Sequence, residues 1–171
     1  MELKYKWIPC KKGYYTPYKK GVRNIEGIII HQTDGYEAGD VATLSGQTKR
    51  KVSAHWYVAK TGKIYHFVDN NDIAWHAGEC IRGWGNSNTI GIENEHIGNK
   101  RDWTDAQMDA LAKLIVALRQ KYGKNIICKG HSDVAVPRGR KVDPEGFDWN
   151  DLHNRAEKFK SENILLVKED S

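Results

Sequence analysis

Residues 25–31 read IEGIIIH, and their apolar run Ile28–Ile30 is followed directly by His31. Apolar residues at successive positions are typical of a strand buried on both faces, as in the centre of a sheet covered by helices. A second apolar run, residues 126–128, lies shortly before His131 and predicts another short buried strand. The sequence therefore predicts an α/β domain with a central mixed β-sheet flanked by helices.

Turn and capping signals place the other elements. Glycine in Lys60-Thr61-Gly62 predicts the turn of a β-hairpin whose strands are residues 54–59 and 63–68. Thr104 and Gln107 form a capping-box pattern, and apolar residues then recur at helical spacing up to Gly123. Further helices are predicted over residues 37–48 and from Asp148 onward, and residues 69–88 are predicted to be loop.

We expect one catalytic domain over residues 1–171, because this length suits a single core. Residues 1–24 are basic, aromatic and rich in turn-forming residues, and predict an irregular arm. Residues 25–160 form the expected core. Residues 161–171 are a tail, and the sequence leaves open whether it packs on the domain.

Composition excludes several classes of protein. No stretch approaches the roughly 20 apolar residues of a membrane span, and the N-terminus MELKYKWIPC lacks the apolar segment of a signal peptide. Three widely spaced cysteines imply no disulfide framework. The net charge of +5 is concentrated near the N-terminus, which is typical of a solvated basic face or of attraction to a polyanion such as an anionic cell wall. No zinc-finger spacing or RNA-binding aromatic motif favours nucleic acid.

Two histidines at the ends of buried strands indicate a metal site. Taken singly, His31 and His131 are more often structural residues than ligands. Asp143 lies in a loop that Pro137, Gly139, Pro144 and Gly146 keep irregular after His131. Two imidazoles and a carboxylate, with a fourth position left to water, form a three-ligand set that catalytic zinc uses. We therefore predict one catalytic zinc ion bound by His31, His131 and Asp143.

Two further residues are candidates for catalysis. In residues 89–95 the strand alternation turns Ile90 and Ile92 to one side and Glu93 and Glu95 to the other. Glu93 is deeper in the strand and is the better candidate for a general base beside a zinc-bound water, although a solvated strand face is the plainer interpretation. Lys141, by default a surface charge, is a candidate to stabilise an oxyanion.

Substrate contacts are predicted from the loops at residues 32–53 and 70–88, which we expect to wall the cleft. The candidates for these contacts are Lys51, Trp75, Arg82, His55 and His76. The two histidines have an alternative role, because a second imidazole nitrogen often orients a metal ligand.

Six segments in order resemble the zinc-dependent N-acetylmuramoyl-L-alanine amidases of the type 2 family, which include phage endolysins and are related to peptidoglycan recognition proteins. The segments are IIIHQT (28–33), KVSAHWYVAKTGKIY (51–65), IAWHAG (73–78), SNTIGIENE (87–95), WTDAQMDALAKLI (103–115) and GHSDVAVPRGRKVDP (130–144). The resemblance covers roughly residues 25–155.

The resemblance implies zinc held by His31, His131 and Asp143, a general base at Glu93 and an oxyanion-stabilising lysine at Lys141. It implies hydrolysis of the amide bond between N-acetylmuramic acid and L-alanine in peptidoglycan. Some phage members carry a tyrosine where this chain has Ala54, so Glu93 must act as the base alone. Eleven residues separate His131 from Asp143, which is slightly long for the family. Binding-only relatives typically lack the third ligand, so Asp143 favours an enzyme.

The preferred interpretation is a phage or prophage endolysin made in the cytoplasm, acting as a monomer on the bacterial cell wall after release. A cytoplasmic muropeptide-recycling enzyme fits the same sequence. Rival functions are a non-catalytic peptidoglycan-binding module and a zinc peptidase that cuts within the stem peptide. A lysozyme-type glycosidase is disfavoured, because Glu93 and Glu95 point the same way while glycosidic cleavage needs carboxylates on opposite sides of the bond.

Overall fold

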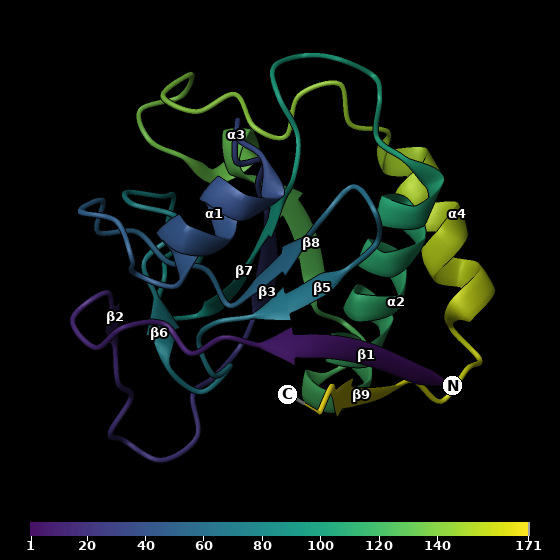
Figure 1. Cartoon of the computed structure of the whole chain (residues 1–171), viewed down its shortest axis with the longest axis horizontal. Helices are drawn as coiled ribbons and strands as arrows, with labels where there is room; N and C mark the ends of the chain where they lie inside the picture. Colours follow the sequence, from purple (N-terminus) through teal and green to yellow (C-terminus); the bar gives the residue numbers. More distant parts are fainter. Residues whose placement is uncertain (171) are drawn as a thin grey trace.

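Seven strands form the main sheet of this chain, whose computed structural model describes residues 1–170. Their order is β8-β3-β7-β4-β5-β1-β9 (Figure 1). The strands are β1 (Glu2–Trp7), β3 (Gly27–Ile30), β4 (Trp56–Val58), β5 (Ile64–His66), β7 (Thr89–Asn94), β8 (Ile127–Gly130) and β9 (Leu165–Lys168). All neighbours are parallel except β4 and β5, which form the expected antiparallel hairpin. The predicted mixed sheet is confirmed.

The central strand β3 is buried on both faces, as its apolar run predicts. Ile28 and Ile30 belong to the hydrophobic core beneath α2 (Asp105–Tyr122), whereas Ile29 packs with Ala77 and Val134 on the opposite face. All three isoleucines are 0% exposed. The sheet therefore has an apolar core on each side, and β3 links the two.

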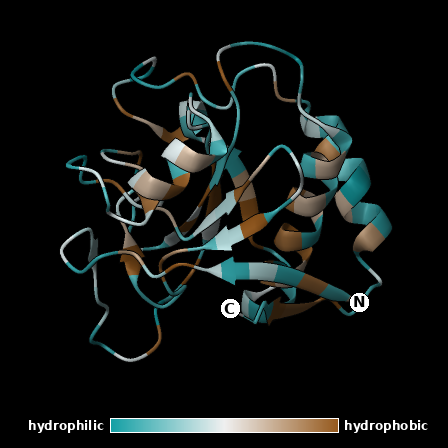
Figure 2. Cartoon of the chain, viewed as in Figure 1, coloured by the Kyte–Doolittle hydropathy of each residue, from teal (hydrophilic) through white to brown (hydrophobic). Residues whose placement is uncertain are grey.

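Helices α2 and α4 (Trp149–Phe159) cover one face, while α1 (Glu37–Leu44) and α3 (His131–Val134) lie on the other (Figure 1). Hydrophobic residues concentrate where α2 meets the sheet, and the outward turns of α4 are hydrophilic (Figure 2). Among residues 1–170, no helix combines the length and apolar character needed to cross a bilayer.

The predicted helix starts are confirmed with one difference. Thr104 accepts a hydrogen bond from the Gln107 backbone N–H at 3.1 Å, and Asp148 accepts one from the Asp151 backbone N–H at 3.0 Å. The Gln107 side chain does not return to Thr104, so the capping box is half formed. The Gln107 side-chain amide donates instead to the carbonyls of Val58 in β4 and of Glu95, the residue after β7, and so ties α2 to the ends of these two strands.

The prediction of an irregular arm over residues 1–24 is wrong for its first part. β1 lies inside the sheet between β5 and β9. Its side chains alternate, with the aromatic residues Tyr5 and Trp7 turned inward and Lys4 and Lys6 exposed. This period of two is a strand signal that the density of lysines obscured. The tail is also ordered, because β9 pairs with β1 in parallel from Glu2 opposite Leu165.

Three other expectations need smaller corrections. The loop at residues 69–88 contains β6 (Ile73–Ala74), which pairs with β2 (Tyr15–Thr16). The segment after His131 begins with the single helical turn α3 before it becomes irregular. The strand predicted around residues 126–128 is β8, the edge strand of the sheet that residues 1–170 form, and Ile127 on this edge is 56% exposed.

His66 gives the fold a measurable pH dependence. His66 is 7% exposed, and its ring stacks on that of Trp56 with 3.8 Å between the two ring centroids. Burial lowers the pKa of His66 to about 4. As the pH falls below about 6.5, the unfolded chain binds a proton at this residue while the folded chain does not. The resulting loss of unfolding free energy, about 3 kcal/mol, accumulates between pH 6.5 and pH 4. We predict that His66→Phe, which keeps the stacked ring, removes this part of the loss.

Urea unfolding at pH 7.0, 5.5 and 4.5 measures the effect. His153→Phe, on the exposed side of α4, is the control and should keep the wild-type slope of stability against pH. Equal slopes for His66→Phe and wild type would contradict the assignment.

Candidate metal centre and catalytic cleft

Three adjacent parallel strands bring functional residues to the same level of the sheet. Ile30 of β3 pairs with Ile92 of β7 on one side and with Gly130 of β8 on the other. The next residues along the three strands are His31, Glu93 and His131. Ligand sites commonly form at the carboxyl ends of parallel strands. The register of β3 with its two neighbours therefore gathers residues that lie 38 to 100 positions apart in the sequence.

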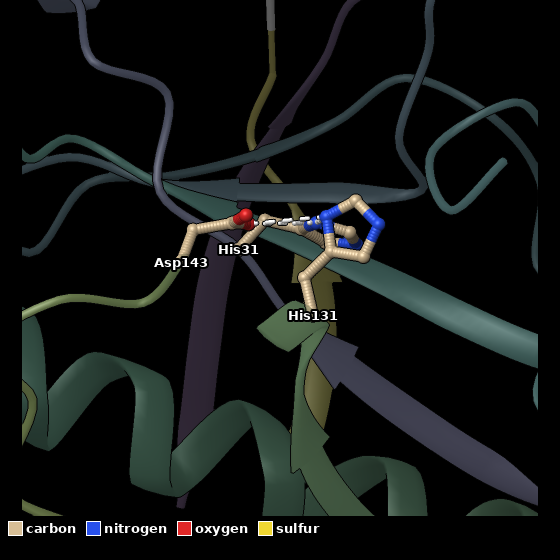
Figure 3. A group of neighbouring side chains, drawn as sticks. All are labelled: His31, His131 and Asp143. Carbon is tan, nitrogen blue, oxygen red and sulfur yellow. Dashed lines mark hydrogen bonds and ion pairs between the residues drawn. The ribbon is translucent and has the colours of Figure 1, made fainter. Parts of the chain in front are cut away.

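His31, His131 and Asp143 form one buried cluster (Figure 3). The two Nδ1 atoms lie 3.0 Å apart, and Asp143 Oδ2 lies 3.2 Å from His31 Nδ1 and 3.3 Å from His131 Nδ1. The three residues are 1%, 3% and 8% exposed. The structure thus brings together the three residues predicted from the sequence as metal ligands.

Hydrogen bonds fix the tautomer of His131. Its Nε2 lies 2.8 Å from the carbonyl oxygen of Ala77, which only accepts, so Nε2 carries the proton. In the neutral ring this leaves a lone pair on Nδ1, directed into the cluster. Arg140 also donates to the Ala77 carbonyl, at 3.1 Å, and holds that oxygen in place.

A chain of hydrogen bonds sets the tautomer of His31 in the same way. Thr89 Oγ1 donates to the Gly85 carbonyl at 2.9 Å and therefore accepts from His76 Nε2 at 3.4 Å. His76 Nδ1 then accepts from His31 Nε2 at 2.9 Å, which leaves the His31 Nδ1 lone pair facing the cluster. His76 thus takes the orienting role that the sequence analysis offered as one of two alternatives.

Gly91 makes room for this arrangement. A Cβ at position 91 would lie 2.4 Å from His76 Cγ, closer than any side chain tolerates. The sequence TIGIE therefore needs glycine at the centre of β7 so that His76 can pack against the strand and reach His31.

The donor set fits a divalent cation. Two imidazole lone pairs and a carboxylate oxygen converge within 3.3 Å with no proton between them, and such a group is stable around a positive ion. Burial lowers the pKa of His31 to about 4, which keeps the ring in the neutral form that binds metals. Asp143 is buried as well, and its Oδ2 faces the same point as the two Nδ1 atoms.

Glu93 of β7 and Glu95, which directly follows the strand, have different surroundings. Glu95 accepts hydrogen bonds from the backbone N–H groups of Lys60 at 2.8 Å and Glu37 at 3.2 Å, so it braces the hairpin turn and the start of α1. Glu93 lines the cleft, and its Oε2 is buried without a hydrogen-bond partner among the described residues. Burial, with Asp143 and Asp40 nearby, raises the pKa of Glu93 well above its usual value. This carboxylate is suited to accept a proton.

A cleft of about 290 Å³ opens over the cluster. Its walls come from residues 31–53, from Trp75 and His76, and from residues 140–143, with Glu93 and His131 inside. Lys141 lines it and has no hydrogen bond or ion pair within residues 1–170. The wall at residues 32–53 is where the sequence analysis expected it, whereas only Trp75 and His76 of residues 70–88 reach the cleft.

Four of the five predicted substrate contacts fall into two pairs. Trp75 and His76 line the cleft, but Lys51 and Arg82 are exposed outside its lining. The cationic residues that do line it, besides Lys141, are Arg50 and Arg140. Neither was predicted from the sequence. Arg50 is next to Lys51, and Arg140 is next to Lys141, and the sequence does not tell which side chain of two adjacent basic residues points into the cleft.

His55 is not placed to touch a substrate. It is 0% exposed, lies 3.1 Å from the Arg23 guanidinium and accepts a hydrogen bond from the Gly91 backbone N–H at 3.0 Å. Its role is to support β7 from beneath the cleft.

Comparison with known proteins agrees with this geometry. Residues 21–146 match the family described as N-acetylmuramoyl-L-alanine amidase. Over 107 residues the chain is 40% identical to the 1,6-anhydro-N-acetylmuramyl-L-alanine amidase AmpD of Haemophilus influenzae, an alignment that covers 58% of this chain and 55% of the relative. The chain thus spans about half the length of the curated relatives it matches.

Solved structures show the same fold. A selenomethionine AmpD derivative superposes with a TM-score of 0.76 at 26% identity, covering 88% of this chain and 93% of the other. AmiD of Escherichia coli, solved with the substrate anhydro-N-acetylmuramic acid-L-Ala-D-gamma-Glu-L-Lys, gives a TM-score of 0.66 at 28% identity, covering 80% and 59%. The buried two-histidine, one-aspartate cluster and the family match over most of the chain lead to one conclusion: this protein belongs to the N-acetylmuramoyl-L-alanine amidase family.

Proposed function

We propose that this chain is a zinc-dependent amidase that hydrolyses the bond between N-acetylmuramic acid and L-alanine. The observation that carries the proposal is the cluster of His31, His131 and Asp143, in which both histidine tautomers present a lone pair to a common point. Membership of the amidase family supplies the bond that is cut.

Zinc bound by these three residues would polarise the scissile carbonyl and lower the pKa of a water molecule. Glu93 then takes the proton from the attacking water. Lys141 donates to the carbonyl oxygen as negative charge develops on it. When the C–N bond breaks, Glu93 returns the proton to the departing L-alanine nitrogen. The buried, unpartnered Oε2 of Glu93 is the atom that carries this proton.

The substrate is proposed to be peptidoglycan or a fragment of it. The curated relatives are named for the 1,6-anhydro-N-acetylmuramyl group, which favours a released fragment as substrate. The basic N-terminal sequence favours the anionic wall and an endolysin that acts there after leaving the cytoplasm. In either case Arg50, Arg140 and Lys141 provide positive charge in the cleft for the carboxylates of a stem peptide.

The activity is tested by release of amino groups from purified peptidoglycan and from a soluble muramoyl peptide. We expect new N-terminal alanine, loss of activity with a chelator and recovery with zinc. Wall binding without amine release at any zinc concentration would identify a binding module. Release of amino groups from within the stem peptide would identify a peptidase.

Replacement of Glu93 tests the proton transfer. We predict that Glu93→Gln lowers kcat by about 10²- to 10⁴-fold, because an amide cannot act as the base. Bound zinc, measured by metal analysis, should be unchanged. Glu95→Gln is the matched control: it weakens the braces to Lys60 and Glu37, so it should lower thermal stability but leave kcat close to wild type. A Glu93→Gln enzyme with full kcat would exclude this mechanism.

His76 is predicted to act through the metal ligand His31. His76→Phe keeps the ring volume against Gly91 but removes the acceptor for His31 Nε2–H. We expect zinc affinity to fall about 10- to 100-fold, as for other residues that orient a ligand. Competition with a chromophoric chelator measures this, and circular dichroism checks the fold. Unchanged affinity would show that the hydrogen bond does not set the His31 tautomer.

A further inference from the structure

A second pocket lies beside the catalytic cleft, on the far side of the loop that carries Asp143. Asp143 lines the cleft, and the next residue, Pro144, lines this pocket, which has a volume of about 680 Å³. Loops at residues 99–103 and 144–148 form its sides, and both cross the upper edge of the molecule in Figure 1.

Three aromatic rings line this pocket. The Trp103 and Phe147 ring centroids lie 4.8 Å apart in an edge-to-face arrangement, and Phe147 meets Trp149 in the same way at 4.8 Å. His96 stacks on Trp103 at 4.2 Å and supports it from behind. Trp149 is 36% exposed although it is a large aromatic residue, so part of its ring faces solvent at the rim. The pocket thus offers aromatic surface that the protein itself does not cover.

The pocket is held in shape by contacts between its two loops. Trp103 Nε1 donates to the Glu145 carbonyl at 3.0 Å. Gly146 has a φ of +60°, and a Cβ there would lie 2.2 Å from the Lys100 carbonyl oxygen, so the loops touch backbone to backbone. A rigid aromatic pocket loses little conformational entropy when a ligand binds.

Polar groups at the rim have mixed charge. Arg101 and Asn150 are exposed and have no hydrogen bond or ion pair within the described residues, while Asp148 caps α4 and Asp151 pairs with Arg155. One cation beside two carboxylates does not favour an anion. The chemistry fits a neutral ligand with an apolar face for the rings and hydroxyl or amide groups for the rim. A pyranose ring has this character, because its axial C–H groups form an apolar face and its hydroxyls point outward.

We infer that this pocket binds an N-acetylhexosamine ring of a glycan chain, beyond the muramic acid whose amide is cut. The inference rests on the proposed function for the identity of the substrate. It extends that function because residues 143–149 provide both the ligand Asp143 and the aromatic residues Phe147 and Trp149. The enzyme therefore prefers a muramoyl peptide that is still part of a chain over one that carries a single sugar.

The test uses a β-1,4-linked N-acetylglucosamine tetramer, which has no peptide and no scissile amide. Titration of ¹⁵N-labelled protein should shift the indole signals of Trp103 and Trp149, and Trp149→Ala should weaken tetramer binding about three- to tenfold. Trp149→Phe should restore most of it. His153→Ala is the matched control, one helical turn further along α4 on its exposed side, and should bind as wild type.

Kinetics give an independent readout. Trp149→Ala should raise KM for glycan chains by a similar factor while leaving kcat, and KM for a single-sugar muramoyl peptide, unchanged. The inference would be overturned if Trp149→Ala raised KM equally for both substrates. It would also be overturned if the indole signals did not shift with the tetramer, or if they shifted with free stem peptide instead. If wild type cleaves neither substrate, the proposed function fails, and the tetramer titration still decides whether the pocket binds sugar.

Discussion

The parallel pairing of β3 with β7 and β8 is the constraint on which the site depends. Ile30 pairs with Ile92 and with Gly130, and the three residues that follow are His31, Glu93 and His131. A slip of one residue in either pairing would turn the neighbouring side chains to the opposite face of the sheet. Register is strongly specified here, because a slip would also move Ile90 and Ile92 out of the core beneath α2.

Successive side chains of these strands point to opposite faces of the sheet, so the residues that stabilise the fold and those of the candidate site lie on different faces. In β3 and β7 the side chains that face α2 are isoleucines, whereas the positions between them include His31, Gly91 and Glu93. Burial of the isoleucines contributes about 1.5 to 3 kcal/mol per side chain and fixes the backbone from which the functional residues project. Changes on the functional face can therefore alter the chemistry while the opposite face continues to hold the fold.

Much of the fold and of the candidate site follows from local sequence. His31 and His131 stand out because each follows an apolar run, and Glu93 because it interrupts one, whereas Asp143 was found only as an acidic residue in the irregular loop after His131. The hairpin and α2 have clear turn and spacing signals. β1 was not predicted because alternating lysines hide its inward aromatic residues, and its partners β5 and β9 are distant in the chain. Long-range pairing of this kind leaves no local signal.

The sequence could not distinguish the roles of His55 and His76, because the difference between them depends on a third segment of the chain. His55 and His76 both lie in similar surroundings in the sequence, yet His55 is fully buried beneath Gly91 while His76 reaches His31. The difference is set by Gly91, whose missing side chain leaves space for one imidazole, while its backbone N–H binds the other. One glycine in β7 thus determines which histidine supports the strand and which orients the metal ligand. Such a role becomes visible only when three segments, β7 and the two that carry the histidines, are placed together.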